Sequence, residues 1–234
     1  LTTADRVMTF KLAVKKIAHK HGLHATFMPK PIFGIAGSGM HINISMAKDG
    51  KNVFCDESDK NGLSSTAYSF IAGIMEHIKG MTAVTNPLVN SYKRLVPEFE
   101  APVYIAWSAQ NRSPLIRVPA ARGQGTRVEL RSADPSANPY LALAVTIAAG
   151  LDGVKRGLVP PPAVDGNIYA MSDAQRKKHK IQMLPTSLES AITELKKDKL
   201  ICNTLGEHIL EKYVEAKELE WQNYKTRISQ WEID

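Results

Sequence analysis

The sequence is poor in cysteine and has no long apolar run, and each shortage excludes a class of protein. Its two cysteines, Cys55 and Cys202, lie far apart and show no metal-binding spacing. We therefore expect free thiols and a cytoplasmic protein. No stretch approaches 18 consecutive apolar residues, which excludes a membrane-spanning helix. The chain also begins without an initiator Met and without the basic and then apolar residues of a signal peptide, so its start looks internal to a longer chain.

The formal net charge of +7 does not indicate a nucleic-acid-binding protein. The lysines gather near the C-terminus on segments that look helical, and no aromatic residues interrupt them. The arginines differ, because six of them fall within residues 94–131: Arg94, Arg112, Arg117, Arg122, Arg127 and Arg131. Two guanidinium groups about 6 Å apart repel by roughly 3 kcal/mol at an effective dielectric of 20. Such a cluster is best tolerated where it holds anions, and arginine suits bidentate contacts with carboxylate and phosphate.

The order of the predicted elements indicates an α+β fold. Strands dominate the front of the chain, and we expect them at 24–28, 40–47, 103–109, 113–118 and 126–132. Helices are expected at 4–21, capped by Thr3, at 65–79, stopped by Gly80, and at 139–156, opened by Asn138-Pro139. Residues 84–104 contain three prolines and predict mainly a loop.

The last third of the chain, from residue 160, is predicted to be helical. Two capping-box patterns, Thr186-x-x-Glu189 and Thr204-x-x-Glu207, predict helix starts. The second pattern opens a long helix that extends past Tyr224 and suits either subunit contacts or packing on its own domain.

Two of the predicted strands place polar side chains on one face. Alternation over 40–46 puts His41, Asn43 and Ser45 on the side opposite Ile42 and Ile44. In 126–131 the same alternation groups one glutamate with two arginines: Arg127, Glu129 and Arg131. A water-exposed face would explain either strand alone. One histidine and one glutamate among these arginines instead suggest a divalent cation paired with a phosphate.

A glycine-bearing loop, Gly37-Ser38-Gly39, precedes the first of these strands. Glycine has no Cβ, so the backbone there can approach a ligand closely. The loop is not a Walker loop, because no Gly-Lys-Ser/Thr follows it. By itself it is a weak signal of function.

Taken in order, these segments resemble type I glutamine synthetase over almost the whole chain. Six stretches carry the resemblance: ATFMPKP at 25–31, GSGMH at 37–41, NSYKRLVP at 90–97, NRS at 111–113, RVELR at 127–131 and DPSANPY at 134–140. The resemblance implies one domain over 1–234, a C-terminal catalytic domain with a largely antiparallel, curved sheet flanked by helices. Residues 160–234 would be the helical region of that domain.

The resemblance also implies the chemistry: an ATP-dependent joining of ammonia to glutamate through γ-glutamyl phosphate, with Mg²⁺ or Mn²⁺. His41 and Glu129 match metal ligands, whereas Gly37, Arg94 and Arg131 match positions that hold glutamate. Glu100 and Arg112 match catalytic residues, the first taking a proton from ammonium and the second stabilising the transferring phosphoryl group. The positions around ATP are matched by Asn43, Ser45, Arg112, Arg117 and Arg127. None of the departures from common family residues, at Ala36, Asn43 and Glu98, removes a group that the mechanism requires.

Part of the family's site has no counterpart in this sequence. The other metal ligands are glutamates on strands that precede the segment matching Leu1, and a small N-terminal domain completes each site from a neighbouring subunit. We therefore expect the chain to be inactive alone and its parent to form a large oligomer, commonly of twelve subunits. Two alternatives stay open: a ligase that joins glutamate to a polyamine or another amine, and a non-catalytic structural relative. Tyr169 falls near a tyrosine that some relatives modify with AMP, but the helix-like residues after it do not favour such a role.

Overall fold

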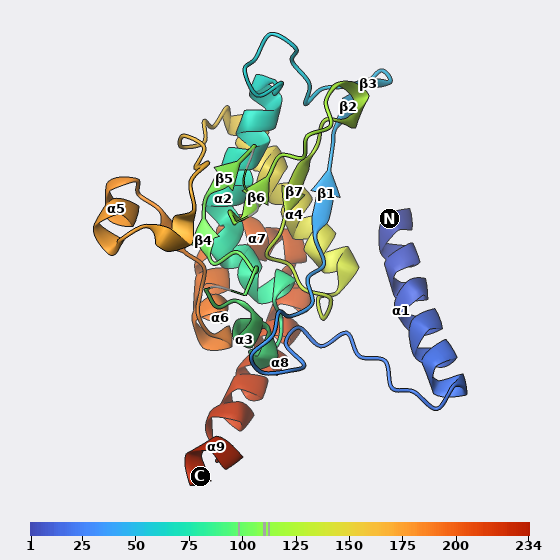
Figure 1. The fold of residues 1–234 in the computed structure, drawn as a ribbon. Coiled ribbons are helices and arrows are strands. Elements are labelled where there is room, and N and C mark those ends of the chain that lie inside the picture. Colours follow the sequence, from blue (N-terminus) through green and yellow to red (C-terminus); the bar gives the residue numbers. More distant parts are fainter. Residues whose placement is uncertain (98, 110, 112) are drawn as a thin grey trace.

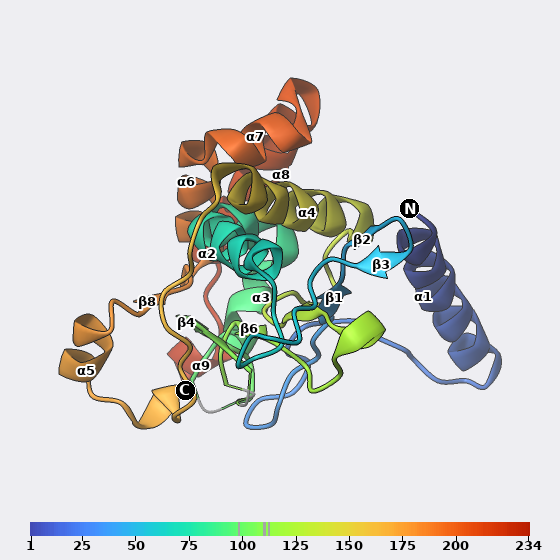
Figure 2. The ribbon, with the colours of Figure 1, turned by 90° about the horizontal axis from the view of Figure 1, so that it is seen from above.

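The computed structural model describes residues 1–97, 99–109, 111 and 113–234. Two long helices, α2 (Ser65–Thr85) and α4 (Pro139–Arg156), pack side by side in the middle of the molecule (Figure 1). A small sheet lies on one side of this pair, and the C-terminal helices cover the other (Figure 2). The α+β fold predicted from the sequence is confirmed.

The main sheet has the strand order β1 (Ile42–Ile44), β7 (Val128–Leu130), β6 (Ile116–Arg117) and β5 (Trp107–Ser108). The pairs β1–β7 and β7–β6 are antiparallel, and β6–β5 is parallel. Two short pairs accompany it: β2 (Ala47–Lys48) with β3 (Lys51–Asn52), and β4 (Tyr104–Ile105) with β8 (Gln182–Met183). The sheet is therefore largely antiparallel, as expected.

The register of the main sheet produces two rows of side chains across its strands. Ile42, Leu130, Ile116 and Trp107 are cross-strand partners, and all four are buried in the core. The neighbouring row consists of polar partners: Asn43, Glu129, Arg117 and Ser108. Because paired residues share a face of the sheet, the second row gathers chemistry from four strands on one surface.

Helices α2 and α4 touch backbone to backbone. A Cβ built on Gly73 would lie 2.2 Å from the carbonyl oxygen of Ala149, and one on Gly153 would lie 2.1 Å from that of Ser69. These distances leave no room for any side chain. The predicted helix stop at Gly80 is wrong, because α2 continues to Thr85 and a Cβ at Gly80 would meet the Asp198 side chain at 2.7 Å. This glycine admits a neighbouring segment.

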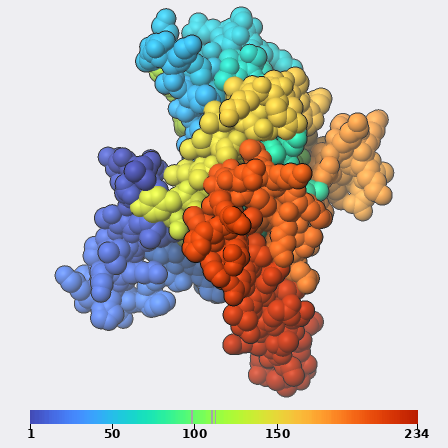
Figure 3. Space-filling model, turned by 180° about the vertical axis from the view of Figure 1, so that it is seen from behind, coloured from blue at the N-terminus to red at the C-terminus, as the bar shows by residue number. Residues whose placement is uncertain are grey.

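The last third is mainly helical, as predicted, but it also contains β8 and irregular stretches such as residues 158–167. It contains α5 (Asp173–Lys178), α6 (Leu188–Lys197), α7 (Lys199–Leu205), α8 (Glu207–Lys225) and α9 (Gln230–Ile233), after the short 3₁₀ turn η2 (Ile168–Ala170). Seen from behind, the orange and red residues of this region lie beside the yellow ones of α4 (Figure 3), which α7 contacts. Both predicted helix caps are wrong by one or two residues. Ser187 caps α6, and Gly206 precedes α8 while Thr204 lies inside α7.

Three further elements differ from the sequence prediction. Residues 24–28 form no strand. Helix α3 (Val89–Arg94) occupies part of the predicted loop, where the Ser91 hydroxyl accepts a hydrogen bond from the Leu88 amide at 3.1 Å. The expected first helix exists as α1 (Thr2–Lys20), at one side of the molecule (Figure 1). It contacts the start of α4, where the Tyr140 hydroxyl donates to Asp5 at 2.5 Å, but its Phe10 stays 60% exposed. The remaining short turn is the 3₁₀ element η1 (Gly123–Gly125). Among the described residues, no helix is both long and apolar enough to cross a membrane.

His77 joins three helices through two carboxylates. Its Nδ1 lies 2.8 Å from Asp198 Oδ2, at the start of α7, and its Nε2 lies 3.1 Å from Asp152 Oδ2 on α4. The hydrogen bond to Asp198 raises the pKa of His77 above its ordinary value, against burial, which lowers it. A raised folded-state pKa stabilises the fold fully below the unfolded value of about 6.5, and the contribution is lost as the pH rises through the folded-state pKa.

We expect His77→Gln to lower the free energy of unfolding by about 1.5–3 kcal/mol at pH 6, the range for hydrogen bonds to charged groups, and by less at pH 9. Urea denaturation at both pH values measures the difference. His24→Gln, an exposed position in coil, is the control. An equal loss at both pH values would show that the charge of His77 is not involved.

Candidate functional site

Glu129 occupies the centre of the polar row. It is 6% exposed on β7, and its two oxygens have different partners. Oε1 lies 3.0 Å from His41 Nδ1, and Oε2 lies 2.8 Å from Arg117 Nε. Because Glu129 pairs with Arg117 in the strand register and His41 directly precedes β1, the sheet itself brings these three side chains together.

The two-face prediction for these strands is confirmed, with one difference between them. On β1 the side chains of His41, Asn43 and Ser45 are exposed, opposite residues that pack on the core. Glu129 and Arg131 are instead buried, with Arg131 only 7% exposed. A water-exposed face therefore does not explain the polar residues of β7.

The glycine loop lies directly against Arg94 and His41. A Cβ on Gly37 would come within 2.3 Å of the Pro29 carbonyl oxygen and 3.2 Å of Arg94 Cγ. A Cβ on Gly39 would lie 2.7 Å from an Arg94 guanidinium nitrogen and 3.1 Å from His41 Nε2. Both glycines allow the loop to approach these neighbours closely, whereas the approach of its backbone to a ligand stays a prediction.

Arg94 itself is fixed in place at the end of α3. It is 3% exposed, and its guanidinium donates to the carbonyl oxygens of Ser132, at 2.5 Å, and Arg131, at 3.3 Å. Burial lowers the pKa of Arg94, and the carboxylate of Asp134 opposes that shift. The side chain therefore holds its orientation before any ligand arrives.

The surroundings of His41 favour its neutral form. Burial lowers the pKa of His41 and the positive charge of Arg131 adds to this, whereas Glu129 raises it. A neutral imidazole is the form that binds metals. A histidine nitrogen and a carboxylate oxygen also suit a divalent cation.

The fit to a metal is partial. Among the residues that the structure describes, no group of three or more His, Cys, Asp and Glu side chains could hold an ion. His41 and Glu129 can supply two ligands, and a hard cation such as Mg²⁺ takes about six. The remaining ligands must come from other groups.

Arg127 and Arg122, two further arginines of the sequence cluster, contact different parts of the structure. Arg127 donates from Nε to Asn43 Oδ1 at 3.2 Å, so it lies beside the exposed face of β1. Arg122 donates to the carbonyl oxygen of Asn61 at 2.7 Å and to two carbonyl oxygens of its own loop. It therefore holds that loop against Asn61. Arg112 lies outside the described residues.

Glu100 has an unusual backbone conformation. Its φ of +61° lies in the left-handed region, which costs a residue with a Cβ about 1–2 kcal/mol. Its side chain is exposed. A non-glycine residue in this conformation persists only where its surroundings hold it.

The whole chain matches one known protein family. The family described as glutamine synthetase, catalytic domain, matches residues 1–234. The chain belongs to this family. It is 62% identical to a glutamine synthetase of Clostridium saccharobutylicum over 234 residues, which are 100% of this chain and 53% of that relative. It is 58% identical to a glutamine synthetase of Thermus thermophilus, over 100% of this chain and 52% of that relative.

Solved structures agree with the family assignment. A structure of GmaS without ligand has a TM-score of 0.87 at 39% sequence identity. The match covers 99% of this chain and 52% of the GmaS chain. A GmaS/ADP complex has a TM-score of 0.88 at 38% sequence identity, and the match covers 98% of this chain and 53% of the GmaS chain. This glutamine synthetase domain therefore spans about half the length of the relatives that it matches.

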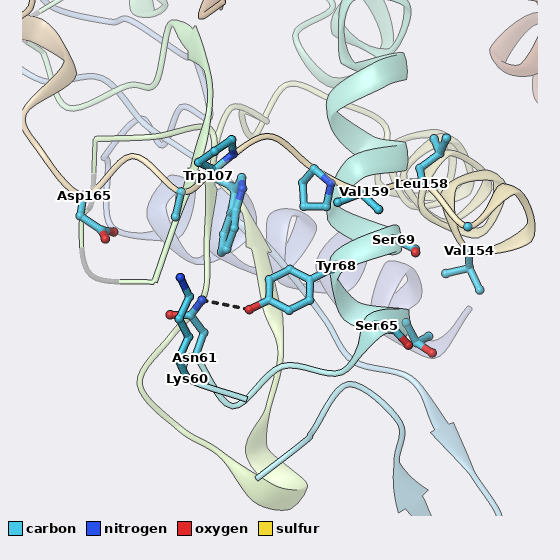
Figure 4. A pocket seen from close by; sticks show the side chains of 15 residues that line it. Lys60, Asn61, Ser65, Tyr68, Ser69, Trp107, Val154, Leu158, Val159 and Asp165 are labelled. Atoms are coloured by element: carbon cyan, nitrogen blue, oxygen red, sulfur yellow. Dashed lines mark hydrogen bonds between the residues drawn. The ribbon is translucent and has the colours of Figure 1, made fainter. Parts of the chain in front are cut away.

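A hollow in the glutamine synthetase domain is lined by none of the predicted site residues that the structure describes. Its volume is about 670 Å³, and its walls include Tyr68, Trp107 and Leu158 (Figure 4). Asp165 lines it and lies 2.5 Å from the hydroxyl of Ser108, the last member of the polar row. The hollow therefore borders the sheet at β5, whereas His41 and Glu129 lie at β1 and β7.

Sequence reasoning missed several groups around the glutamine synthetase motifs. Lys30 and Tyr169 contact the residues on either side of Glu100. Lys30 belongs to the ATFMPKP stretch, but nothing in that stretch indicates a contact with Phe99. Tyr169 lies 68 residues from the backbone oxygen to which it donates. Only the folded chain shows these contacts.

Proposed function

We propose that this chain forms the nucleotide- and glutamate-facing part of an ATP-dependent glutamate–ammonia ligase. The observation that carries the proposal is the array of Glu129 between His41 and Arg117, with the glycine loop and Arg94 against it. It combines two metal-capable atoms with arginines suited to carboxylate and phosphate. The GmaS/ADP complex among the similar structures supports a nucleotide role.

In the first step, a γ-carboxylate oxygen of glutamate attacks the terminal phosphorus of ATP, and ADP leaves. Such a transfer depends on positioning and charge neutralisation more than on covalent help from the protein. We assign Arg94, Arg131 and the Gly37 backbone to glutamate, and Arg117, Arg127, Asn43 and Ser45 to ATP. Arg112 is assigned to the transferring phosphoryl group. A bound Mg²⁺ or Mn²⁺ would supply further positive charge at the phosphates, held in part by His41 and Glu129.

In the second step, the nitrogen of ammonia attacks the acyl carbon of γ-glutamyl phosphate, and phosphate leaves. Glu100 takes the proton that ammonium must lose to become a nucleophile. Its segment also limits the access of water, which would hydrolyse the acyl phosphate. The products are glutamine, ADP and phosphate.

The rest of the site belongs, in our proposal, to chain outside this sequence. We infer that residues 1–234 act as one C-terminal catalytic domain that includes the helical region 160–234. The domain alone would be inactive, and its complete form would be a cytoplasmic oligomer, commonly of twelve subunits. The difference in length from the relatives supports this division.

A chimera tests the function. Residues 1–234 replace the matching segment of the Clostridium saccharobutylicum glutamine synthetase, and we expect the hybrid to form glutamine from glutamate, ammonium and ATP. Glu100→Ala in the hybrid should lower turnover about 100-fold or more, within the usual contribution of a general base, while ATP affinity stays within about twofold. Lys48→Ala, at an exposed position on β2, is the control. A hybrid that binds ATP but forms no glutamine would reject the proposed reaction.

A further inference from the structure

Glu100 lies between two side-chain contacts that come from distant parts of the chain. On one side, the ammonium of Lys30 lies 3.8 Å from the centre of the Phe99 ring. On the other, the hydroxyl of Tyr169 donates to the carbonyl oxygen of Ala101 at 2.8 Å. Both residues adjacent to Glu100 are thus held.

The Lys30 contact rests on a fixed backbone. The Lys30 amide donates to the Asn90 side-chain oxygen at 2.8 Å, and the Asn90 amide group donates back to the Lys30 carbonyl at 3.0 Å. The ammonium also donates to the carbonyl oxygen of Ile35. Lys30 therefore connects helix α3, Ile35 just before the glycine loop, and Phe99.

The Tyr169 contact is similarly supported. Tyr169 lies in the turn η2, where the Asn167 side chain accepts a hydrogen bond from its amide at 3.0 Å. Its ring packs against Tyr104 with centroids 5.8 Å apart. Burial raises the pKa of Tyr169, so its hydroxyl stays protonated and can donate to Ala101.

We propose that Lys30 and Tyr169 are positioning residues that together hold Glu100 in its left-handed backbone conformation. The positive φ of Glu100 needs such support, and the contacts on Phe99 and Ala101 supply it from opposite directions. The importance of Glu100 for the reaction rests on the proposed function, whereas the support itself does not. Lys30 also ties Glu100 to the loop of Gly37, so the two sides of the glutamate site keep their spacing.

Proteolysis of the 234-residue chain measures the support directly. A glutamate-specific protease cuts after Glu100 only when this segment opens, so the rate follows the open population. Lys30→Met should accelerate that cut by about 2- to 5-fold, the factor expected from losing an exposed cation–π contact. Tyr169→Phe, which removes only the hydroxyl, should accelerate it about 5-fold. Mass spectrometry separates this cut from cuts at other glutamates, and the exposed Glu57 provides an internal reference.

The conservative variant and a matched lysine control the result. Lys30→Arg keeps a cation over the ring and should stay within about twofold of the wild-type rate. Lys48→Met, at an exposed lysine on β2, should leave the cut after Glu100 unchanged, and all variants should keep the wild-type melting temperature. If Lys30→Met and Tyr169→Phe cut at the wild-type rate, the proposal is wrong. If Lys30→Arg accelerates the cut after Glu100 as much as Lys30→Met does, a positive charge over the Phe99 ring is not what holds the segment. A chimera without glutamine formation would leave this result untouched and would reject only the ligase function.

Discussion

Glu129→Gln in the chimera is expected to reduce glutamine formation by at least about 100-fold, because it removes the negative charge that lies between His41 and Arg117. Glutamine keeps the size of the side chain, so the sheet should survive. The amide is a poorer metal ligand than a carboxylate, so Mn²⁺ affinity should fall as well. Steady-state kinetics and Mn²⁺ titration measure the two effects.

Glu57→Gln provides the matched control for this experiment. It makes the same change of one carboxylate to an amide, at an exposed position outside the polar row. Its activity should remain that of the unmodified chimera. Wild-type turnover in Glu129→Gln, with circular dichroism confirming a folded protein, would show that this carboxylate is structural only.

Gly153→Val is expected to lower the free energy of unfolding by about 3 kcal/mol or more, at the upper end of overpacking effects. The first atom of the new side chain would lie 2.1 Å from the Ser69 carbonyl oxygen and 2.7 Å from Gly73 Cα. Both are backbone atoms, so no rotamer change can relieve the contact. Helices α2 and α4 would have to separate, and much of the core packs on them.

Ala144→Val tests whether the loss comes from that contact. Ala144 is exposed on the same helix, so valine there changes helix propensity by only a few tenths of a kcal/mol. Urea denaturation of the two variants gives the comparison. A loss in Gly153→Val no greater than in Ala144→Val would mean that the two helices can move apart freely.

The alternation of residues was enough to predict the site strands. Ile42 and Ile44 on one side of β1, and His41 and Asn43 on the other, follow from the period of two in any strand. Asn138-Pro139 likewise predicted the start of α4 correctly, because both residues act locally at a helix terminus. The glycine loop could be predicted for the same reason, since close approach at Gly37 and Gly39 requires the smallest residue.

Features that depend on distant partners could not be predicted. Gly80 resembled a helix stop, but its role is set by Asp198, which lies 118 positions later in the sequence. Helix α3 forms in a proline-rich stretch because Tyr92 and Leu95 find a core to enter. The burial of Glu129 and Arg131 depends on how the layers stack. Spacing along the chain carries no information about such contacts.

The pairing of β1 with β7 has a consequence for the order of folding. His41 and Glu129 are 88 residues apart, and α2 and α3 lie between them. Contacts of such long sequence separation form slowly, because the chain must first lose the entropy of a large loop. We therefore expect the helices to form early and the His41–Glu129 pair to form late. A nascent or partly folded chain would have its arginines but no assembled site, so ligand binding would report completed folding.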